Sequence, residues 1–566
     1  MDVSQNLLAA PIVIPMIMAS LSLVIGRVGQ QQIGQQQVGQ QQDSTAPIQL
    51  QRWLAMIAVL LNLGVAILIL QYTVQGHRLV LQMGLWDAPF GITVLADALS
   101  AIMLTLTGIL AVAIVPFAAG TLDKRERMNF YPVLLFLLMG VNGAFLSGDL
   151  FNLYVFFEVL LMASFVLLTL GGQTKQINGG LRYVVLNLLG SLIFLSAAAI
   201  AYGTLGTLNM AQMAQRVDSL PPSTLALLGG LLLVAYSSKA GLFPLYFWLP
   251  SSYHVPHPAI TAFFGGLLTK VGVYTLLRIF PLIFPTLLQE WRPLILTVAG
   301  LTMLAGVLGA MALGTIRRVL SFQIISHVGY MIMGLGLAFS NQQLAFGFGI
   351  AAAILYLIHH MIAKTALLMA GGTVELEMAS GSLLRKQLGG LVTRRSALAV
   401  LFFCAAFSLA GVPPFSGFVS KLGLLQIALD SEQWLIAGVS VAVSVLTMIN
   451  MAQLWQKVFW GEPDPQKRVT PNPNAPLRTH GGRLLTLTPI AMLVILSLTI
   501  GVFSGTVFRW STVAAEQVLD REGYIADVGP TDEIIYMEYH GDKEHSDKEH
   551  SDKESSDDTK SEGDGH

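Results

Sequence analysis

Five ionisable side chains lie inside long apolar stretches of this 566-residue chain. They are Glu158, Lys239, Lys270, Lys364 and Lys421. A charge held at the centre of a bilayer costs about 3 kcal/mol or more, so an intramembrane glutamate or lysine is a candidate for function. Both residue types can release and take up a proton, whereas arginine stays charged in proteins. The set indicates movement of protons, with a structural ion pair as the alternative for Glu158.

Histidines accompany these residues along the chain. His327 lies in the apolar stretch SFQIISHVGYMIMGLG, and His360 stands four positions before Lys364. Residues four apart share a helix face, so His360 and Lys364 should point the same way while His359 points elsewhere. A single histidine in a membrane is as often a hydrogen-bonding clamp between helices as a proton carrier. As a set, the histidines could form a relay. Two further histidines could extend it: His254, and His257 about four turns before Lys270 on the same helix.

The five charged residues suggest how a proton could move between them. Burial disfavours the charged form of a lysine, and a nearby carboxylate favours it again. Glu158 opposite Lys239 would keep that lysine charged. Drawing the two apart would release the proton toward Lys270 through histidines and water, and Lys421 could then exchange it with the outer face.

A proline follows Lys239 in the stretch SSKAGLFPLYFWLP. Pro244 has no N–H, so the carbonyl of Ala240 loses its helical partner, and the proline ring crowds that carbonyl. We expect the helix to break beside Lys239.

A second break is expected in the stretch LAGVPPFSGFVSKLGLL. Pro413 and Pro414 free the carbonyls of Leu409 and Ala410, and Lys421 follows one or two turns later. Freed backbone at membrane depth is tolerated only where it is buried in protein or lines a watery cavity. Each of two lysines therefore lies beside a predicted helix break.

The composition requires a membrane. Hydrophobic residues make up 54% of the chain and charged residues 11%, against roughly 25% charge in a soluble domain. Apolar runs that are long enough to cross the bilayer recur along the chain. We interpret the first of them as a helix rather than a cleaved signal peptide. We place fourteen spans near 7–26, 53–73, 96–120, 130–148, 150–171, 183–207, 223–249, 258–284, 293–314, 319–340, 344–371, 396–429, 433–459 and 484–508.

The two breaks suggest an internal duplication, because interrupted helices in corresponding halves mark inverted-repeat transporters. The fold class expected is all-α, with two inverted five-helix repeats and breaks in the seventh and twelfth spans. The alternative is that proline and glycine are simply common in membrane helices. The expected divisions are 1–129 for the first three spans, 130–284 and 293–459 for the repeats, 484–508 for the last span, and 509–566 for a tail.

Lysine and arginine cluster in alternate loops, which predicts that those loops are cytoplasmic. The other loops carry only Arg78, Arg216, Arg278 and Arg292, and no arginine is expected inside the spans that carry the lysines. Both chain ends then lie outside. Two low-complexity segments stand apart: the glutamine-rich insert at 30–42, and an acidic tail with two HSDKE repeats at 545–554 that should be disordered.

Nothing indicates a cofactor or a metal. The single cysteine, Cys404, excludes an intrachain disulfide and a cysteine cluster for iron–sulfur or zinc. No GxGxxG opens a soluble nucleotide-binding fold. The formal net charge of −1 gives no reason to expect a nucleic-acid partner.

Several stretches together resemble one family, the proton-translocating antiporter-like subunits shared by respiratory complex I and the Mrp cation/proton antiporters. The stretches are DLFNLYVFFE, SSKAGLFPLYFWLP, LLTKVGVYTLLR, SHVGYMIMGLG, HHMIAKTALLMAGG and PPFSGFVSK. Within that family the chain looks most like the D subunits of Mrp (Mnh) Na⁺/H⁺ antiporters, especially in DLFNLYVFFE and SSYHVPHPAITAFFGGLLTKVGVY. The insert and the acidic tail depart from the family pattern.

The resemblance implies a multi-pass protein of the bacterial cytoplasmic membrane that works with other Mrp subunits and lipid and moves protons against Na⁺ or K⁺. It assigns Glu158 and Lys239 as a coupled pair, Lys270 as the central relay and Lys421 as the terminal group. The alternative is a proton-pumping subunit of a complex I-like oxidoreductase or a membrane hydrogenase, in which partner subunits handle electrons. A structural scaffold with inert ion pairs fits five intramembrane charges poorly.

Overall fold

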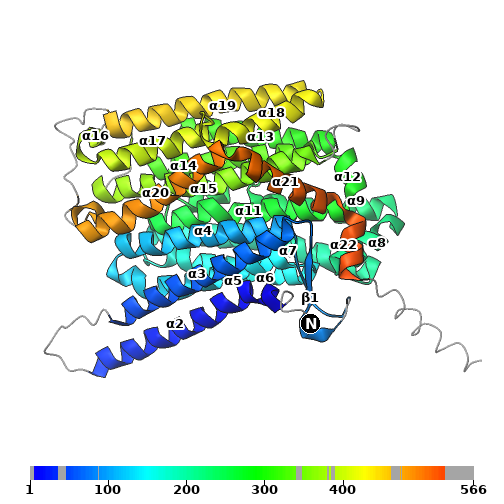
Figure 1. Cartoon of the computed structure of the whole chain (residues 1–566), viewed down its shortest axis with the longest axis horizontal. Coiled ribbons are helices and arrows are strands. Elements are labelled where there is room, and N and C mark those ends of the chain that lie inside the picture. Colours follow the sequence, from blue (N-terminus) through cyan, green and yellow to red (C-terminus); the bar gives the residue numbers. More distant parts are fainter. Residues whose placement is uncertain are drawn as a thin grey trace, which may run out of the picture.

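The chain folds into an array of helices that run side by side, as the computed structural model in Figure 1 shows. The structure describes residues 6–35, 46–86, 88, 90–339, 347–378, 382–383, 389–460, 472 and 475–529. Within these ranges, thirteen helices are long and apolar enough to cross a membrane. The shorter apolar helix Ser396–Ala410 continues beyond a break, which completes the fourteen predicted spans. Most of the glutamine-rich insert and the HSDKE repeats lie outside the described residues.

A small sheet that the sequence pattern did not indicate connects the second span to the third. Strands β1 and β2 pair antiparallel, with Leu79 opposite Ala96. The elements are the 3₁₀ turn η1 (Leu7–Ala9), α2 (Ala10–Gln35), α3 (Ala46–Thr73), β1 (Leu79–Gln82), η2 (Met83–Leu85), β2 (Thr93–Ala96) and α4 (Ala98–Thr121).

The next spans form two series in which the helices follow in the same order. Each series ends with a broken helix and one further span. The first series is α5 (Lys124–Leu146), α6 (Leu150–Thr169), α7 (Thr174–Leu205), α8 (Met210–Arg216), η3 (Val217–Ser219), α9 (Pro222–Ala240), α10 (Trp248–Ser252) and α11 (Pro258–Ile283). The second is α12 (Pro285–Glu290), α13 (Arg292–Met311), α14 (Ile316–Gly336), α15 (Phe348–Met378), α16 (Leu391–Arg394), α17 (Ser396–Ala410), α18 (Ser416–Asp430), α19 (Trp434–Trp455) and the π-helical turn η4 (Gln456–Trp460).

The two breaks are built alike, as the predicted duplication requires. Gly241 and Gly411 end α9 and α17 in the left-handed conformation, with φ of +77° and +88°. At each end, the glycine N–H and the next N–H donate to one carbonyl, that of Ser237 or Phe407. The glycine N–H makes the bond of the αL motif, and the next N–H makes the longer 6→1 bond of the Schellman motif. Three residues after each glycine stands a proline, Pro244 or Pro414.

Helix contacts repeat between the halves as well. A Cβ on Gly140 would meet the backbone N of Leu160, and one on Gly143 the ring of Phe156. The equivalent contacts in the second half join Gly306 to Ser326 and Gly309 to Phe322. In both halves glycine is needed because two helix backbones approach closely.

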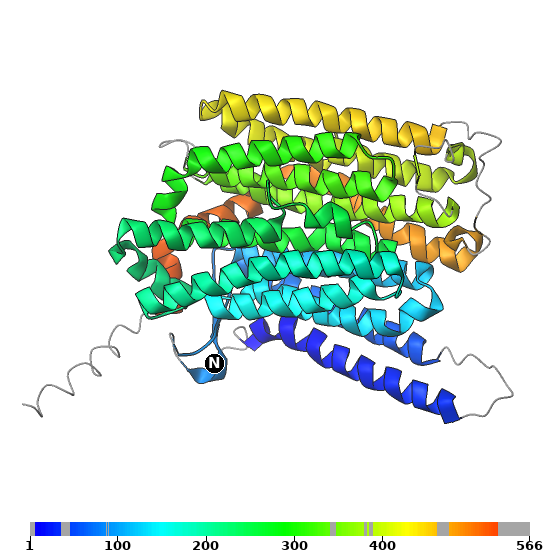
Figure 2. The ribbon, with the colours of Figure 1, turned by 180° about the vertical axis from the view of Figure 1, so that it is seen from behind.

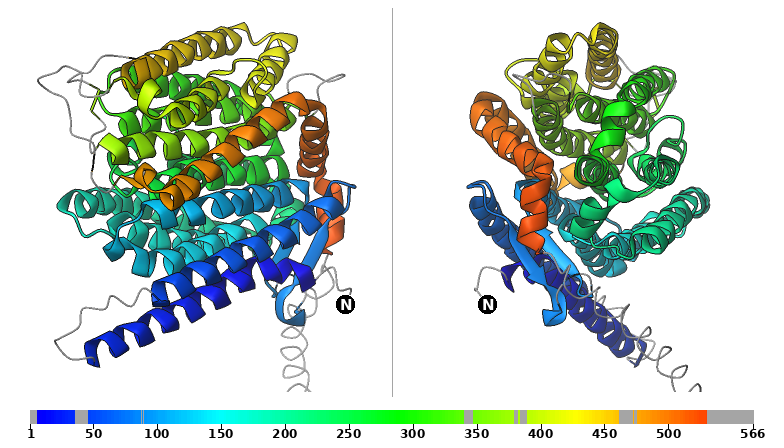
Figure 3. Two further views of the ribbon diagram at one scale, coloured as in Figure 1. Left: turned by 60° about the vertical axis from the view of Figure 1, so that its left-hand side comes forward. Right: turned by 90° about the vertical axis from the view of Figure 1, so that its right-hand side faces the viewer.

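The two central helices, α11 and α15, are wholly buried along their apolar windows. In the outer helices α2, α3, α7 and α19, fewer than half of the residues in the apolar windows are buried. The end-on view on the right of Figure 3 shows an elongated array from α2, in dark blue, to α19, in olive. The polar residues of α11 and α15 are therefore shielded on every side by other helices.

The segment after the last span differs from the prediction. A 3₁₀ turn, η5 (Pro476–Arg478), leads into α20 (His480–Val502), and the chain continues as α21 (Ser504–Leu519) and α22 (Arg521–Val528). The tail expected from residue 509 onward thus begins with helices. Apolar residues such as Val507, Ala514 and Val518 are buried, which explains why this segment is ordered.

One arginine contradicts the sequence analysis. Arg278 was assigned to an outer loop, yet it lies inside α11 and is 3% exposed. Its two terminal nitrogens bind both carboxylate oxygens of Asp97, at 2.5 and 2.6 Å. The bidentate pair offsets the cost of burying the charge, so an arginine does occur within these spans.

Candidate proton-transfer site

Lys239 lies in the last turn of α9, next to the helix break. Its Nζ donates to the Asn187 carbonyl at 3.0 Å and to Ser191 Oγ at 2.7 Å, both on α7. Trp248 Nε1 donates to the carbonyl of Ser238, which the break leaves without a helical N–H. The break therefore places a nearly buried ammonium among polar partners from a neighbouring helix.

Glu158 lies on α6, the helix that packs against α7. Its Oε1 is buried and has no hydrogen-bond partner among the described residues. The adjacent ring of Phe157 lies 5.8 Å from Lys239 Nζ. Within the described part of the chain, no ion pair joins Glu158 to Lys239. The coupled pair stays a prediction, and in this structure the two charges are near without touching.

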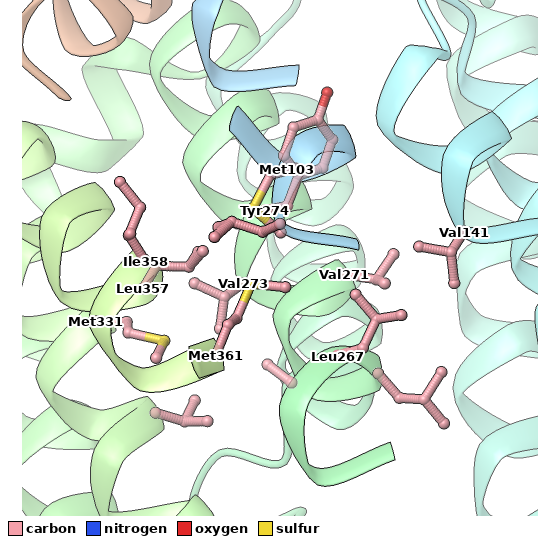
Figure 4. Close-up of a cluster of buried hydrophobic side chains, with 14 of the residues drawn as sticks. Met103, Val141, Leu267, Val271, Val273, Tyr274, Met331, Leu357, Ile358 and Met361 are labelled. Atoms are coloured by element: carbon pink, nitrogen blue, oxygen red, sulfur yellow. The ribbon is translucent and has the colours of Figure 1, made fainter. Parts of the chain in front are cut away.

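Lys270 lies at the centre of the molecule. It is fully buried on α11, and its Nζ donates to the Gly265 carbonyl of the same helix at 2.6 Å. Figure 4 shows the apolar packing around this part of α11, with Met103, Met331 and Met361 coming from three other helices. Such close packing excludes bulk water, so a proton here has to pass along polar side chains and single ordered water molecules.

A cluster of titratable groups follows on α14 and α15. The rings of His327 and His360 are 4.9 Å apart between centroids, and His327 Nδ1 is hydrogen-bonded to Tyr356. Both His360 ring nitrogens and Lys364 Nζ are buried without a partner among the described residues. Buried polar atoms of this kind call for an explanation such as ordered water or a catalytic role.

His359 is a residue that sequence reasoning set aside. The structure turns its ring toward the second break, where His359 Nδ1 lies 2.8 Å from Ser416 Oγ in α18. Ser416 is in turn 2.9 Å from Ser497 in α20. This agrees with the prediction that His359 points away from His360 and Lys364. Two adjacent histidines in one helix point to different sides, so the pair indicates that α15 has polar contacts with two different neighbours.

Lys421 lies on α18, beyond the break rather than before it. Its Nζ donates to the Ala410 carbonyl at 2.9 Å and to Ser444 Oγ at 3.1 Å. Ala410 is one of the two residues whose carbonyls Pro413 and Pro414 were expected to free. Tyr330 on α14 adds its ring face, 5.4 Å from the ammonium. The predicted break therefore supplies the lysine with its acceptor.

His254 and His257 lie at one end of the array, in the connection between α10 and α11. Arg318 donates to His254 Nε2 at 3.1 Å, while His254 Nδ1 contacts the Pro250 carbonyl at 2.9 Å. His257 Nδ1 accepts from the Ala259 N–H and so caps α11. Both rings already have structural partners, which favours an anchoring role over a relay.

The pKa of His254 gives a test of that anchoring role. Burial and then the Arg318 guanidinium lower its pKa from 6.5 to about 4. The unfolded chain therefore binds a proton between these values while folded His254 stays neutral, so stability falls as pH drops from 6.5 to 4. We expect His254→Gln to lose less thermal stability than the wild type between about pH 7.5 and about pH 5. An equal loss in both proteins would contradict this.

These groups form one row across the molecule. The helices that carry them are neighbours in turn: α6 on α7, α7 on α9, α9 on α11, α11 on α15, α15 on α18. Serines, tyrosines and an asparagine that the sequence analysis passed over join the row: Asn187, Ser191, Tyr330, Tyr356, Ser416 and Ser444. In the described residues no group of three or more histidine, cysteine, aspartate or glutamate side chains could hold a metal ion.

Two broken helices and a buried row of lysines and histidines are typical of membrane proteins that transport protons or other ions. Residues 147–447 match the family described as NADH:quinone oxidoreductase/Mrp antiporter, transmembrane. The chain belongs to this family.

The most informative relatives are components of antiporters. The chain is 43% identical to the D subunit of a Na⁺/H⁺ antiporter from Alkalihalophilus pseudofirmus, over 93% of this chain and 99% of that protein. Among solved structures it is similar to a chain of the Mrp complex from a Dietzia species, with 31% identity, a TM-score of 0.81, and coverage of 93% and 100%. A chain of respiratory complex I from Thermus thermophilus has the same fold, with a TM-score of 0.72 at 20% identity, covering 91% and 99%.

Proposed function

We propose that this chain is the proton-translocating subunit of a multisubunit antiporter that exchanges Na⁺ or K⁺ for protons. The observation that carries the proposal is the row of titratable side chains from Glu158 to Lys421, which stand on helices that pack against one another in turn. The chain's sequence identity to D subunits of Na⁺/H⁺ antiporters favours an antiporter over other proteins that have the same fold.

In this proposal Lys239, Lys270 and Lys421 hold and release the proton in turn. Glu158 stabilises the charged form of Lys239 when the two approach, and loses that effect when they separate. His327, His360 and Lys364 bridge from Lys270 toward His359 and Ser416, with water completing the gaps. Pro244, Pro413 and Pro414 contribute by opening the helices beside two of the lysines.

The proposal includes a setting. The chain lies in a bacterial cytoplasmic membrane, both ends outside, and assembles with the other subunits of an Mrp-type complex and with lipid. The described lysines and arginines near the end of α2 and near the beginnings of α17 and α20 lie at one end of the array (Figures 1 and 2). Positive loops are retained on the cytoplasmic side, which supports this orientation.

The second candidate is a proton-pumping subunit of a complex I-like oxidoreductase or membrane hydrogenase. It is favoured by the fold shared with respiratory complex I. In that case electron transfer in partner subunits would drive the same proton row, and no cation would be exchanged.

The test is a measurement in inverted vesicles that contain the whole assembly. A ΔpH is first imposed, and its collapse is followed after addition of NaCl, KCl or choline chloride. We expect Na⁺ or K⁺, and not choline, to collapse the gradient, and vesicles lacking only this chain to show no response. If neither cation acts and NADH or another electron donor generates a ΔpH, the redox hypothesis replaces the antiporter.

A further inference from the structure

A pocket of about 170 Å³ lies at the arginine-rich end of the molecule, away from the lysine row. It opens where α16 meets the beginnings of α17 and α20, at the same end of the array in Figure 1 and Figure 2. Three arginines line it, Arg394, Arg395 and Arg483. In the described chain its lining includes no acidic side chain.

One of the three positive charges is balanced by a neighbour. Arg395 Nε donates to Glu377 Oε2 at 2.8 Å, and the other Glu377 oxygen accepts from the Leu477 N–H at 2.8 Å. Arg483 Nε donates to the Leu477 carbonyl at 2.6 Å, which fixes the arginine without neutralising it. Arg394 and Arg483 are both exposed, and no described carboxylate pairs with either. Counting the described residues, the pocket therefore keeps two positive charges in excess.

The beginning of α17 adds further positive charge to the pocket. Ser396, Ala397 and Leu398 are its first residues and line the pocket. No side chain caps this end of the helix. The first N–H groups of a helix have no partner within it and carry a partial positive charge. Together with the guanidiniums, they suit the oxygens of a phosphate group.

Apolar surface continues from the pocket along both helices. Val400 stands one turn beyond the pocket residues Ser396 and Ala397 and is 60% exposed. On α20, Leu487 lines the pocket and neighbouring Leu484 is 59% exposed. The site thus joins a basic pocket to the apolar face of two spanning helices. Basic pockets between membrane helices on the cytoplasmic side bind the head groups of anionic lipids.

We propose that this pocket binds the phosphate of an anionic phospholipid, with the acyl chains lying along α17 and α20. The bound lipid would fasten the beginning of α17, and hence the first half of the broken twelfth span, to α20. This site is independent of which ion the protein carries, because none of its residues belongs to the lysine row.

The test measures lipid binding by the chain purified together with its accompanying subunits. Phosphatidylglycerol is titrated into the delipidated complex in a neutral detergent, and bound lipid is counted by native mass spectrometry. The pocket variant is Arg394→Gln/Arg483→Gln. The control is Arg27→Gln/Arg182→Gln, which removes two exposed charges elsewhere on the membrane helices. We expect the pocket variant to bind about 25-fold more weakly, since each juxtamembrane charge contributes about 5-fold, and the control to bind as the wild type does.

Equal phosphatidylglycerol binding by the pocket variant and the wild type would overturn the proposal, as would equal weakening in the control. Two further probes separate the possible sources of phosphate. Phosphatidylcholine should bind weakly, and the two arginine substitutions should not change its affinity. Inorganic phosphate at millimolar concentration should fail to displace phosphatidylglycerol. If inorganic phosphate binds the pocket as well as the lipid does, the site is for a soluble anion and the lipid assignment is wrong.

Discussion

Lys239→Arg is expected to remove nearly all cation-driven proton movement while the chain stays folded. Arginine keeps the positive charge that faces Asn187 and Ser191 but does not deprotonate in proteins. A group that transfers a proton directly contributes on the order of 10²–10⁴-fold to rate. We therefore expect the initial rate of Na⁺- or K⁺-driven ΔpH collapse to fall by about 100-fold or more.

The controls separate chemistry from assembly. Lys175→Ala removes an exposed lysine at the start of α7 and should leave the rate unchanged. Glu158→Gln keeps the shape of the side chain and removes its charge, so it should also abolish most of the rate if the carboxylate acts on Lys239. Each variant is scored only where the complex assembles in wild-type amounts. A Lys239→Arg complex that transports at the wild-type rate would show that Lys239 does not carry the proton.

Arg278→Met is expected to destabilise the protein by about 3–5 kcal/mol, because it leaves the Asp97 carboxylate buried without its counter-charge. Asp97 is fully buried, and Arg278 also lies within reach of Ser100 and Tyr274. The pair joins the start of α4 to the last turns of α11. The measurement is the free energy of unfolding in an SDS titration of the purified complex.

A double variant distinguishes the stranded charge from simple loss of contact. Asp97 also accepts from the Ser100 N–H as the N-cap of α4, and asparagine preserves that cap. Asp97→Asn/Arg278→Met should therefore be more stable than Arg278→Met alone. Arg509→Met, at an exposed position on α21, should change stability by less than about 0.5 kcal/mol. A double variant no more stable than the single one would refute the ion-pair explanation.

The breaks in the seventh and twelfth spans could be predicted because they depend on local chemistry. A proline removes the N–H of its own position and crowds the carbonyl four residues earlier. Neither event needs a neighbouring helix, so Pro244 and Pro414 located both breaks from sequence. What the sequence could not tell is which carbonyls at the breaks would find a partner, and which group would supply it. Trp248 donates to the carbonyl of Ser238 rather than to the predicted Ala240, and Lys421 donates to that of Ala410.

The wrong predictions concern residues whose location depends on contacts with distant parts of the chain. Arg278 was assigned to an outer loop although it falls within the predicted span 258–284, and only the folded chain brings Asp97, far away in sequence, into contact with it. The segment from residue 509 seemed to be tail because it is less apolar, but α21 is amphipathic and buries one face. Its Gln517 accepts from the Ala98 N–H at the start of α4.

The sequence by itself determined the membrane location, the fourteen spans, the breaks and the residue types able to carry protons, because apolar length and side-chain chemistry are properties of short stretches. The tertiary structure decided which side chains meet. Helices α11 and α15 are buried all round, so they have no polar face to show which side meets which neighbour. The contacts of Lys270, His359 and His360 were fixed only when neighbouring helices packed against every face of α11 and α15.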